Sequence, residues 1–228
     1  MQKALEKLII RCQTELPSSI LEAVKPHVSE EVWEAIKENA RIARENRVPF
    51  CQDTGIPIFF VEGMESIDPI IRKTYASVAK KLPMSMHFRS HTHFSATDLP
   101  IIYHEPGKGR VTYLCKGIGA ELYSAVTNLS DYDEIPELVR DTVAAAGTCA
   151  CPPYFIGVGI GSSLDHAAFL AKKAHILRGC MTPFEKSMTA KNVASVRVME
   201  KPVPSAGIFV AVDLQCWANR FASIEVRE

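Results

Sequence analysis

Residues 147–163, GTCACPPYFIGVGIGSS, decide the fold class of this 228-residue chain. The stretch begins as a turn with cysteine and proline, and continues as a short apolar run and a glycine-rich loop. This order is typical of a buried strand bounded by turns. Helical patterns flank it over residues 134–146 and 164–178. Helix and strand patterns in alternation predict a mixed α/β (α+β) protein, with helices around a mixed sheet.

The same reading extends outward along the chain. Helical spacing predicts helices near the N-terminus, over 30–46 with Ser29 as the cap, and over 68–81. Strand-like runs occupy 56–61, 110–115 and 206–214, and a polar turn, 51–55, precedes the first of them. In the helix at 30–46, one buried stripe is expected from Val32, Trp33, Ile36, Ala40 and Ala43. We expect one domain over 1–228, with a helical part at about 1–48 and an α/β part at about 49–228.

Composition narrows the class of protein. Lys plus Arg and Asp plus Glu balance at 26 each. The chain therefore lacks the excess of positive charge that is typical of nucleic-acid-binding proteins. No apolar run approaches the roughly 20 residues that cross a bilayer. The first residues lack a small-residue cleavage site, so a cytoplasmic protein without a membrane partner is expected.

Three of the seven cysteines lie where an apolar element meets a polar or proline turn: Cys51, Cys151 and Cys216. An odd number of cysteines argues against a disulfide framework and favours free thiols or thiolate ligands. No CxxC pair supports a zinc ribbon or a ferredoxin-type run. A lone cysteine is usually a small buried hydrophobe, so spacing alone does not decide their role. The other four occupy unmarked positions: Cys12, Cys115, Cys149 and Cys180.

The local sequences around these cysteines are more informative. Residues 51–55 read CQDTG, residues 150–154 read ACPPY before GVGIG, and residues 216–220 read CWANR. These strings, in this order, closely resemble class I fumarase and the alpha subunit of L-tartrate dehydratase, and the resemblance runs from about residue 35 to 220. It implies the fold of the cluster-binding N-terminal domain of class I fumarase.

The resemblance also implies a site. In that family the three cysteines hold a 4Fe-4S cluster, and the aspartate two residues after the first, here Asp53, is the catalytic acid. Three thiolates leave one iron open to act as a Lewis acid on a substrate hydroxyl or carboxylate. Gln52 and Thr54 offer neutral donors to a carboxylate. Taken alone, CQDTG is also a polar turn in which Asp53 and Thr54 satisfy backbone groups.

A second segment matches the family's glycine-rich KGGG substrate loop. Here it reads Lys116-Gly117-Ile118-Gly119-Ala120, and an ordinary strand-to-helix turn is an equal alternative. Arg89 is the candidate for the substrate arginine, because a guanidinium fork suits a carboxylate. Lys80 and Lys81 compete with Arg89 for that position.

Two further motifs are expected to have structural roles. His87, His91 and His93 have a spacing that could ligate zinc, but ordinary surface histidines on a strand are expected. The GVGIGSS loop lacks the features of a P-loop or a dinucleotide fingerprint. We interpret its glycines as allowing close backbone packing.

The predicted activity is that of a hydro-lyase subunit. It would add or remove water on a small dicarboxylic or hydroxycarboxylic acid such as fumarate, malate or tartrate. By resemblance, a fumarase-type beta subunit would complete the enzyme in a hetero-oligomer, and homodimerisation is a further expectation. Only 64 residues separate Cys151 from Cys216, without the family's GxGGxTT-like segment, and residues 94–100 replace its NTGxNxP motif. The alternative is therefore a non-catalytic cluster-binding or regulatory paralogue.

Overall fold

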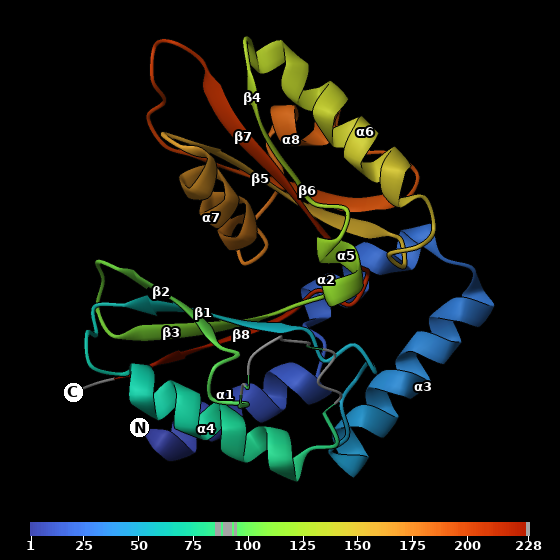
Figure 1. Cartoon of the computed structure of the whole chain (residues 1–228). Coiled ribbons are helices and arrows are strands. Elements are labelled where there is room, and N and C mark those ends of the chain that lie inside the picture. The colour runs from blue at the N-terminus through green and yellow to red at the C-terminus, as the bar shows by residue number, and fades with distance from the viewer. Residues whose placement is uncertain (85–87, 89–92, 94, 227–228) are drawn as a thin grey trace. The chain divides into compact units, whose positions relative to one another are not determined.

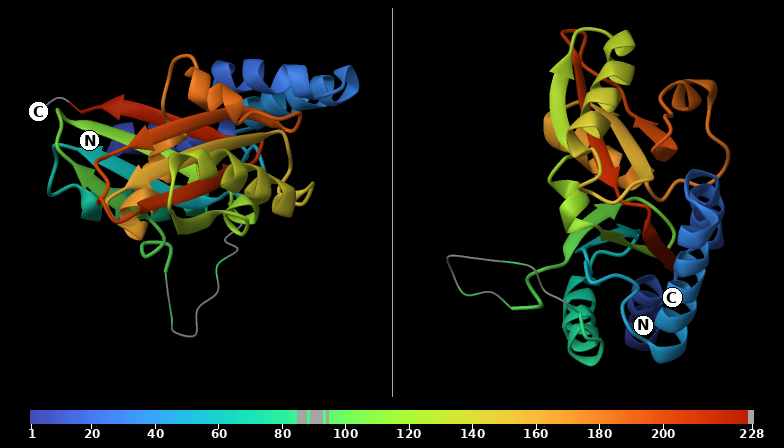
Figure 2. Two further views of the ribbon diagram at one scale, coloured as in Figure 1. Left: turned by 90° about the horizontal axis from the view of Figure 1, so that it is seen from above. Right: turned by 90° about the vertical axis from the view of Figure 1, so that its right-hand side faces the viewer.

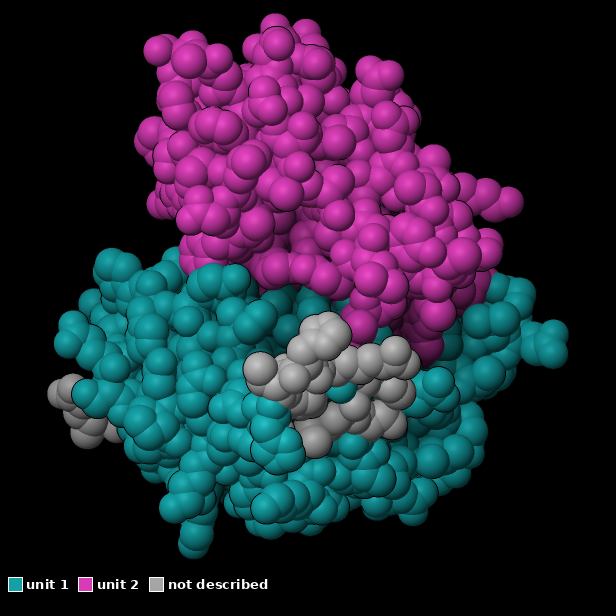
Figure 3. All heavy atoms as spheres, in the orientation of Figure 1, with its two compact units in different colours: residues 1–18, 29–117, 220–228 teal, residues 19–28, 118–219 magenta. Residues whose placement is uncertain are grey.

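The computed structural model describes the chain except for residues 85–87, 89–92, 94 and 227–228. The predictions for His87, Arg89 and His91 lie outside the described residues, and His93 is exposed. The described chain forms two compact units (Figure 3). Unit 1 comprises residues 1–18, 29–117 and 220–228, and unit 2 comprises residues 19–28 and 118–219.

Unit 1 is a sheet with two helices packed on one face. The strand order is β2-β1-β3-β8, in which β1 and β2 are parallel and the other neighbours antiparallel. Helices α1 and α4 lie on the same side of this sheet in the right-hand view of Figure 2. Apolar residues of both helices form one core with alternate residues of β1 and β3. The elements are α1 (Gln2–Thr14), α3 (Glu30–Asn46), β1 (Ile56–Glu62), α4 (Asp68–Lys81), β2 (Ile101–Glu105), β3 (Arg110–Lys116) and β8 (Arg220–Glu225).

Helix α3 begins and ends where its sequence predicts. The Ser29 hydroxyl accepts from the Val32 amide at 3.3 Å, which caps the first turn. The predicted buried stripe is wrong at its start, because Val32 is 46% exposed. Of the predicted stripe, Ile36 and Ala43 are fully buried. The first turn of the helix is open to solvent, so the buried face of α3 is narrower than predicted.

Unit 2 places helices on both faces of a second sheet. The strand order is β4-β7-β5-β6, in which β5 and β6 are parallel and the other pairs antiparallel. Helix α6 covers one face and α7 the other (Figure 1). The elements are α2 (Ser18–Val24), η1 (Lys25–His27), α5 (Ile118–Glu121), β4 (Ala125–Leu129), η2 (Tyr132–Glu134), α6 (Ile135–Ala146), β5 (Tyr154–Gly161), α7 (Leu164–Ala174), α8 (Pro183–Ser187), β6 (Val193–Glu200) and β7 (Ile208–Gln215).

The glycines of β5 allow α7 to approach the sheet. A Cβ built on Gly157 would lie 2.0 Å from the Ala171 carbonyl oxygen, and one on Gly159 would lie 2.0 Å from that of Ala167. The interpretation that these glycines permit close packing is confirmed. The predicted loop is wrong, because residues 157–161 belong to the strand itself. Glycine lacks the β-propensity that pattern reading looks for, so the strand was expected to stop early.

Helix α7 is also shorter than predicted. It ends at Ala174, because the next amides, of Ile176 and Leu177, bond to carbonyls three residues back and tighten the chain into turns.

Helices around mixed sheets confirm the predicted fold class. The expectation of one domain over the whole chain stays a prediction. In the part of the chain that the structure describes, no helix is both long enough and apolar enough to span a bilayer.

Candidate functional site

The CQDTG turn, residues 51–55, connects α3 to β1 in unit 1. Gly55 has φ +76°, and the amide of Gly55 donates to Asp53 Oδ1 at 2.9 Å. Cys51 and Asp53 are half-buried, Gln52 is exposed and Thr54 is buried. The Asp53 contact is that of an ordinary polar turn, and it also orients the carboxyl group.

Buried side chains beneath this turn donate to its carbonyls. Gln13 Nε2 and Cys115 Sγ each lie 2.9 Å from the backbone carbonyl oxygen of Thr54. Arg220 donates to the backbone carbonyl oxygen of Asp53 at 2.6 Å. Arg220 also donates to Gln13 Oε1 at 3.3 Å. We call Gln13, Cys115 and Arg220 the turn network. Its members come from α1, β3 and β8, so three elements far apart in sequence fix one turn.

The cysteines of this region differ in how deeply they are buried. Burial raises the pKa of the Cys115 thiol, and burial likewise raises the pKa of Cys12. Both therefore remain neutral thiols, and Cys115 donates a hydrogen bond to the Thr54 carbonyl. Cys51, in the turn above, is partly open to solvent.

The predicted substrate residues of β3 lie beside the same turn. Ile56 pairs with Lys116 in the sheet, and a Cβ on Gly55 would lie 2.7 Å from the Lys116 carbonyl oxygen. Lys116 is buried, and its Nζ donates to the Gly117 oxygen at 3.3 Å. The structure thus brings Lys116 and Gly117 together with CQDTG. The chain passes from strand β3 into helix α5 here, so the motif is also the strand-to-helix turn that was the alternative prediction.

The other two candidate cysteines meet in unit 2. The Trp217 amide donates to the Cys151 carbonyl at 3.1 Å, which joins the CPP turn to the loop that carries Cys216. Cys151 is exposed with φ +58°, a conformation uncommon for a residue with a side chain. Such backbone outliers concentrate at functional sites, which supports a role for this turn.

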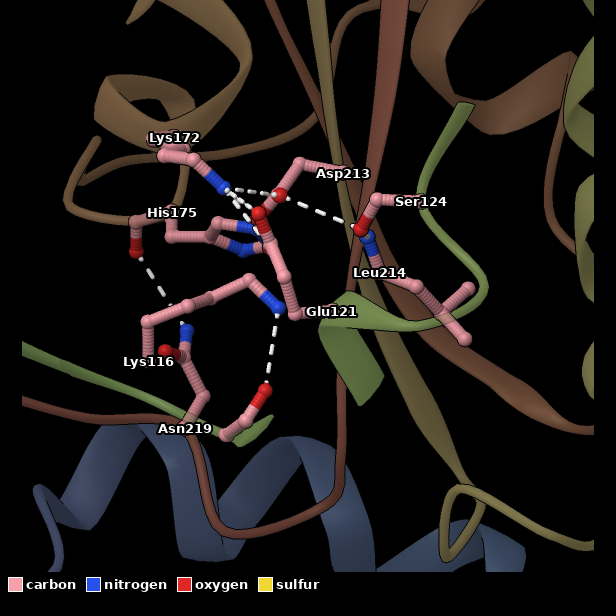
Figure 4. Close-up of polar contacts among 9 residues, drawn as sticks. Lys116, Glu121, Ser124, Lys172, His175, Asp213, Leu214 and Asn219 are labelled. Carbon is pink, nitrogen blue, oxygen red and sulfur yellow. Dashed lines mark hydrogen bonds and ion pairs between the residues drawn. The ribbon is translucent and has the colours of Figure 1, made fainter. Parts of the chain in front are cut away.

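An ionic network lies just before Cys216, at the end of β7 (Figure 4). Lys172 Nζ lies 2.6 Å from Glu121 Oε1 and 2.9 Å from Asp213 Oδ1. His175 Nε2 lies 2.7 Å from Asp213 Oδ2, and Ser124 Oγ donates to Asp213 Oδ1 at 3.2 Å. We call these five residues the Lys172 network. Asp213 projects towards α7, because alternate residues of β7 face α6.

Charge balance fixes the state of Lys172. Burial alone would lower the pKa of Lys172, but the carboxylates of Asp213 and Glu121 outweigh burial and raise that pKa above its ordinary value. Lys172 is therefore a cation at neutral pH, held between two carboxylates.

The network reaches the Cys216 loop through His175. Asn219 Nδ2 donates to the His175 oxygen at 3.4 Å, so residues three before and three after Cys216 share one partner. Among the described residues, the buried Asn219 Oδ1 has no hydrogen-bond partner. Buried acceptors without partners are rare, which is consistent with a loop that faces a group from outside the chain.

Cysteine thiolates are the ligands that hold iron-sulfur clusters. Cys51 and Cys216 are half-buried, and Cys151 is exposed. Cys51 belongs to unit 1, whereas Cys151 and Cys216 belong to unit 2. Within the described ranges, no group of three or more histidine, cysteine or carboxylate side chains is arranged to hold a metal ion.

Sequence patterns did not single out the two networks, although signals were present. Gln13 lies eight residues after Leu5 and four after Ile9, on the buried stripe of α1, where a polar side chain is unexpected. Asp213 is the charged residue within the apolar strand β7. Both are polar groups at core positions, and such groups need buried partners.

Comparisons with known proteins identify the family. The model of the family described as "Fumarate hydratase (Fumerase)" matches residues 2–192. "Putative L(+)-tartrate dehydratase subunit alpha" of Methanocaldococcus jannaschii is 30% identical over 241 residues, covering 86% of this chain and 84% of that protein. "L(+)-tartrate dehydratase subunit alpha" of Escherichia coli is 24% identical, covering 93% and 86%. "Fumarate hydratase 1, mitochondrial" of Leishmania major is 26% identical, covering 55% and 26%. The chain therefore belongs to the hydro-lyase family of class I fumarate hydratases and L(+)-tartrate dehydratase alpha subunits.

Proposed function

We propose that this chain is the alpha subunit of a hydro-lyase that reversibly adds or removes water on a small dicarboxylic or hydroxycarboxylic acid. Cys51, Cys151 and Cys216 would hold a 4Fe-4S cluster, and Asp53 would be the general acid. One observation carries the proposal. The Asp53 carboxyl group lies two residues after Cys51, in a turn fixed by buried donors and placed beside Lys116 and Gly117.

Asp53 has the chemistry that dehydration needs. When bound, an iron with an open coordination position would polarise the hydroxyl that leaves the substrate. Asp53 would then give its proton to that hydroxyl as it departs as water, and would recover a proton in the reverse direction from the attacking water. The bond from the Gly55 amide to Asp53 Oδ1 fixes the orientation of the carboxyl group, so the acid does not have to be ordered during the reaction.

Neighbouring groups would bind the carboxylates of the substrate. Gln52 is exposed beside Asp53 and offers amide hydrogens to an anion. Thr54 and Gly117 would supply further donors, and Lys116 the positive charge. Arg89 is retained as a proposed carboxylate ligand because its guanidinium fork matches that group.

A beta subunit is part of the proposal. The relatives from Methanocaldococcus jannaschii and Escherichia coli are named as alpha subunits, which supports a second chain that completes the enzyme. We propose a hetero-oligomer in which the partner supplies the catalytic base. The alpha chains themselves would form a dimer within it.

Reconstitution tests the ligand set. The chain is purified anaerobically, supplied with iron and sulfide, and assayed for iron, sulfide and absorbance near 400 nm. We expect about four irons per chain, as in a cubane cluster. Each of Cys51→Ser, Cys151→Ser and Cys216→Ser should abolish stable incorporation of iron, because a thiolate ligand is lost. Cys149→Ser is the matched control, since Cys149 is a free, exposed cysteine two residues from Cys151. A wild-type chain without iron would refute the cluster.

Turnover tests the acid. With the beta subunit, the reconstituted chain is assayed on fumarate, malate, tartrate and mercaptosuccinate. Asp53→Asn should keep its iron and lose activity by about 100-fold or more, the usual contribution of a general acid. If the wild-type chain holds a cluster but turns over none of these acids, the result favours the alternative hypothesis of a non-catalytic cluster-binding or regulatory paralogue.

A further inference from the structure

We propose that Gln13 and Arg220 are positioning residues that set the geometry of Cys51 and Asp53. The inference rests on the proposed function, and it assigns roles to two buried residues that would touch neither cluster nor substrate.

Gln13 holds both ends of the turn. Its backbone carbonyl accepts from the Phe50 amide at 2.7 Å, just before Cys51. Its side-chain amide donates to the Thr54 carbonyl at 2.9 Å, just after Asp53. One residue of α1 therefore brackets the three residues 51–53, so a shift of Gln13 moves the cysteine and the acid together.

The Gln13 side chain is itself locked in place. Its amide group has two N–H donors, and these face the Thr54 oxygen and, at 2.8 Å, the Tyr113 hydroxyl. Its Oε1 accepts from Arg220 at 3.3 Å. Gln13 is 0% exposed, so no water can replace a lost partner without opening the core. Nε2 also lies 3.5 Å from Cys115 Sγ, and together these contacts hold the side chain in one rotamer.

Arg220 acts on the middle of the same turn. Its guanidinium is 1% exposed and donates to the Asp53 carbonyl at 2.6 Å while a second nitrogen reaches Gln13. The planar fork explains why arginine suits this position, because two acceptors on different residues must be met at once. A lysine would keep the positive charge but would reach these two acceptors less well.

The charge of Arg220 adds an electrostatic role. A guanidinium stays protonated when buried, so a fixed cation lies against the backbone of Asp53. The hydrogen bond that Arg220 donates to the Asp53 carbonyl is therefore charge-assisted, and such bonds are about twice as strong as bonds between neutral groups. Outer partners of metal ligands typically change metal affinity or activity by about 10- to 100-fold when they are removed.

The experiment uses the full chain, reconstituted anaerobically, with its beta subunit for turnover. Gln13→Met keeps the length and the backbone carbonyl but removes the amide donors. Arg220→Met removes both the guanidinium fork and its positive charge, whereas Arg220→Lys keeps a positive charge without the fork. Thr74→Val is the matched control, a buried polar residue of the same unit whose hydroxyl has no hydrogen-bond partner in the described part of the chain. Four quantities are measured: iron per chain, the rate of iron loss to a chelator, kcat with KM, and the urea midpoint.

We expect Gln13→Met and Arg220→Met to lose iron about 10- to 100-fold faster than the wild type, with a comparable fall in kcat. Arg220→Lys should recover part of the iron retention, and Thr74→Val should match the wild type. A merely structural role would lower the urea midpoint and leave iron loss and kcat unchanged in the folded fraction. That result would overturn the inference.

Other outcomes are also decisive. If Gln13→Met does not fold, Gln13→Asn replaces it. Its amide is one methylene shorter and falls short of the Thr54 carbonyl, so wild-type iron retention in Gln13→Asn overturns the inference. A wild-type chain that binds no iron refutes the proposed function and this inference with it. A wild-type cluster that is insensitive to all of these substitutions refutes the inference alone.

Discussion

The turn network of unit 1 and the Lys172 network of unit 2 both lie beside a candidate cysteine, but they are built differently. In unit 1, side chains donate to backbone carbonyls of the turn that holds Cys51. In unit 2, charged side chains pair with one another, and the loop of Cys216 is contacted through Asp213 and Asn219 on either side of it. The first network acts on the geometry of its turn, whereas the second neutralises charges inside a fold.

This difference predicts different failures. Removing a donor from unit 1 leaves a carbonyl without one partner, which is a local loss of about 1–3 kcal/mol. Removing a charge from unit 2 leaves other charges buried without compensation, which is more costly. Substitutions in unit 2 should therefore affect stability most, and those in unit 1 should affect iron retention most.

The largest effect is expected for Lys172→Met. The Lys172 side chain is only 13% exposed and lies between two carboxylates, so its loss leaves Asp213 and Glu121 facing each other. We expect the free energy of unfolding to fall by about 3–5 kcal/mol, the range for a broken buried pair. Urea denaturation measures this loss. Lys186→Met, at an exposed lysine of unit 2, is the control and should change little. Equal losses in both variants would contradict the comparison.

A somewhat smaller effect is expected when α7 is pushed from the sheet. In Gly159→Ala the new Cβ would lie 2.0 Å from the Ala167 oxygen and 2.3 Å from the Ala171 nitrogen, so the helix must move. Overpacking of this kind costs about 1–3 kcal/mol. Because α7 carries Lys172, the shift should also weaken that network. Thermal unfolding of Gly159→Ala is compared with that of Gly119→Ala, where a Cβ meets nothing within 4 Å. A stable Gly159→Ala would show that the helix packs more loosely than described.

Local patterns predicted the elements whose signals are local. The cap at Ser29 and the helical spacing over 68–81 gave α3 and α4 their observed bounds. Strands β2, β4, β6 and β8 were not predicted, because their burial is partial or irregular and their identity depends on pairing with distant strands. Cysteine motifs similarly identify candidate ligands, whereas the side chains that hold them meet only after folding. Gln13 and Arg220 are 207 positions apart.

The contribution of Lys172 to stability should decrease gradually at alkaline pH. The pKa of Lys172 is raised in the folded chain, so its contribution is full below the ordinary lysine value of about 10.4 and is lost as pH rises through the higher folded value. The stability gap between wild type and Lys172→Met should therefore shrink above about pH 10.4. Lys186→Met corrects for general effects of titration. Urea midpoints measured across this range should show convergence, and a constant gap would argue against an ion-paired Lys172.

The smallest effects come from two buried threonines, one in each unit. In unit 2, the Thr142 hydroxyl donates to the Leu138 carbonyl at 2.8 Å. In unit 1, Thr74 is 1% exposed, and within the described residues its hydroxyl has no hydrogen-bond partner. Valine has nearly the same shape as threonine, so the two substitutions differ mainly in the hydrogen bond that is lost.

Thr142→Val should destabilise the chain by about 1 kcal/mol, because a satisfied hydrogen bond is removed. Thr74→Val should leave stability unchanged or raise it by about 1 kcal/mol, because an unsatisfied buried hydroxyl is replaced by a methyl group. Urea denaturation of both variants resolves a difference of this size. Opposite signs would show that a buried threonine hydroxyl stabilises this chain where it has a hydrogen-bond partner and costs stability where it has none.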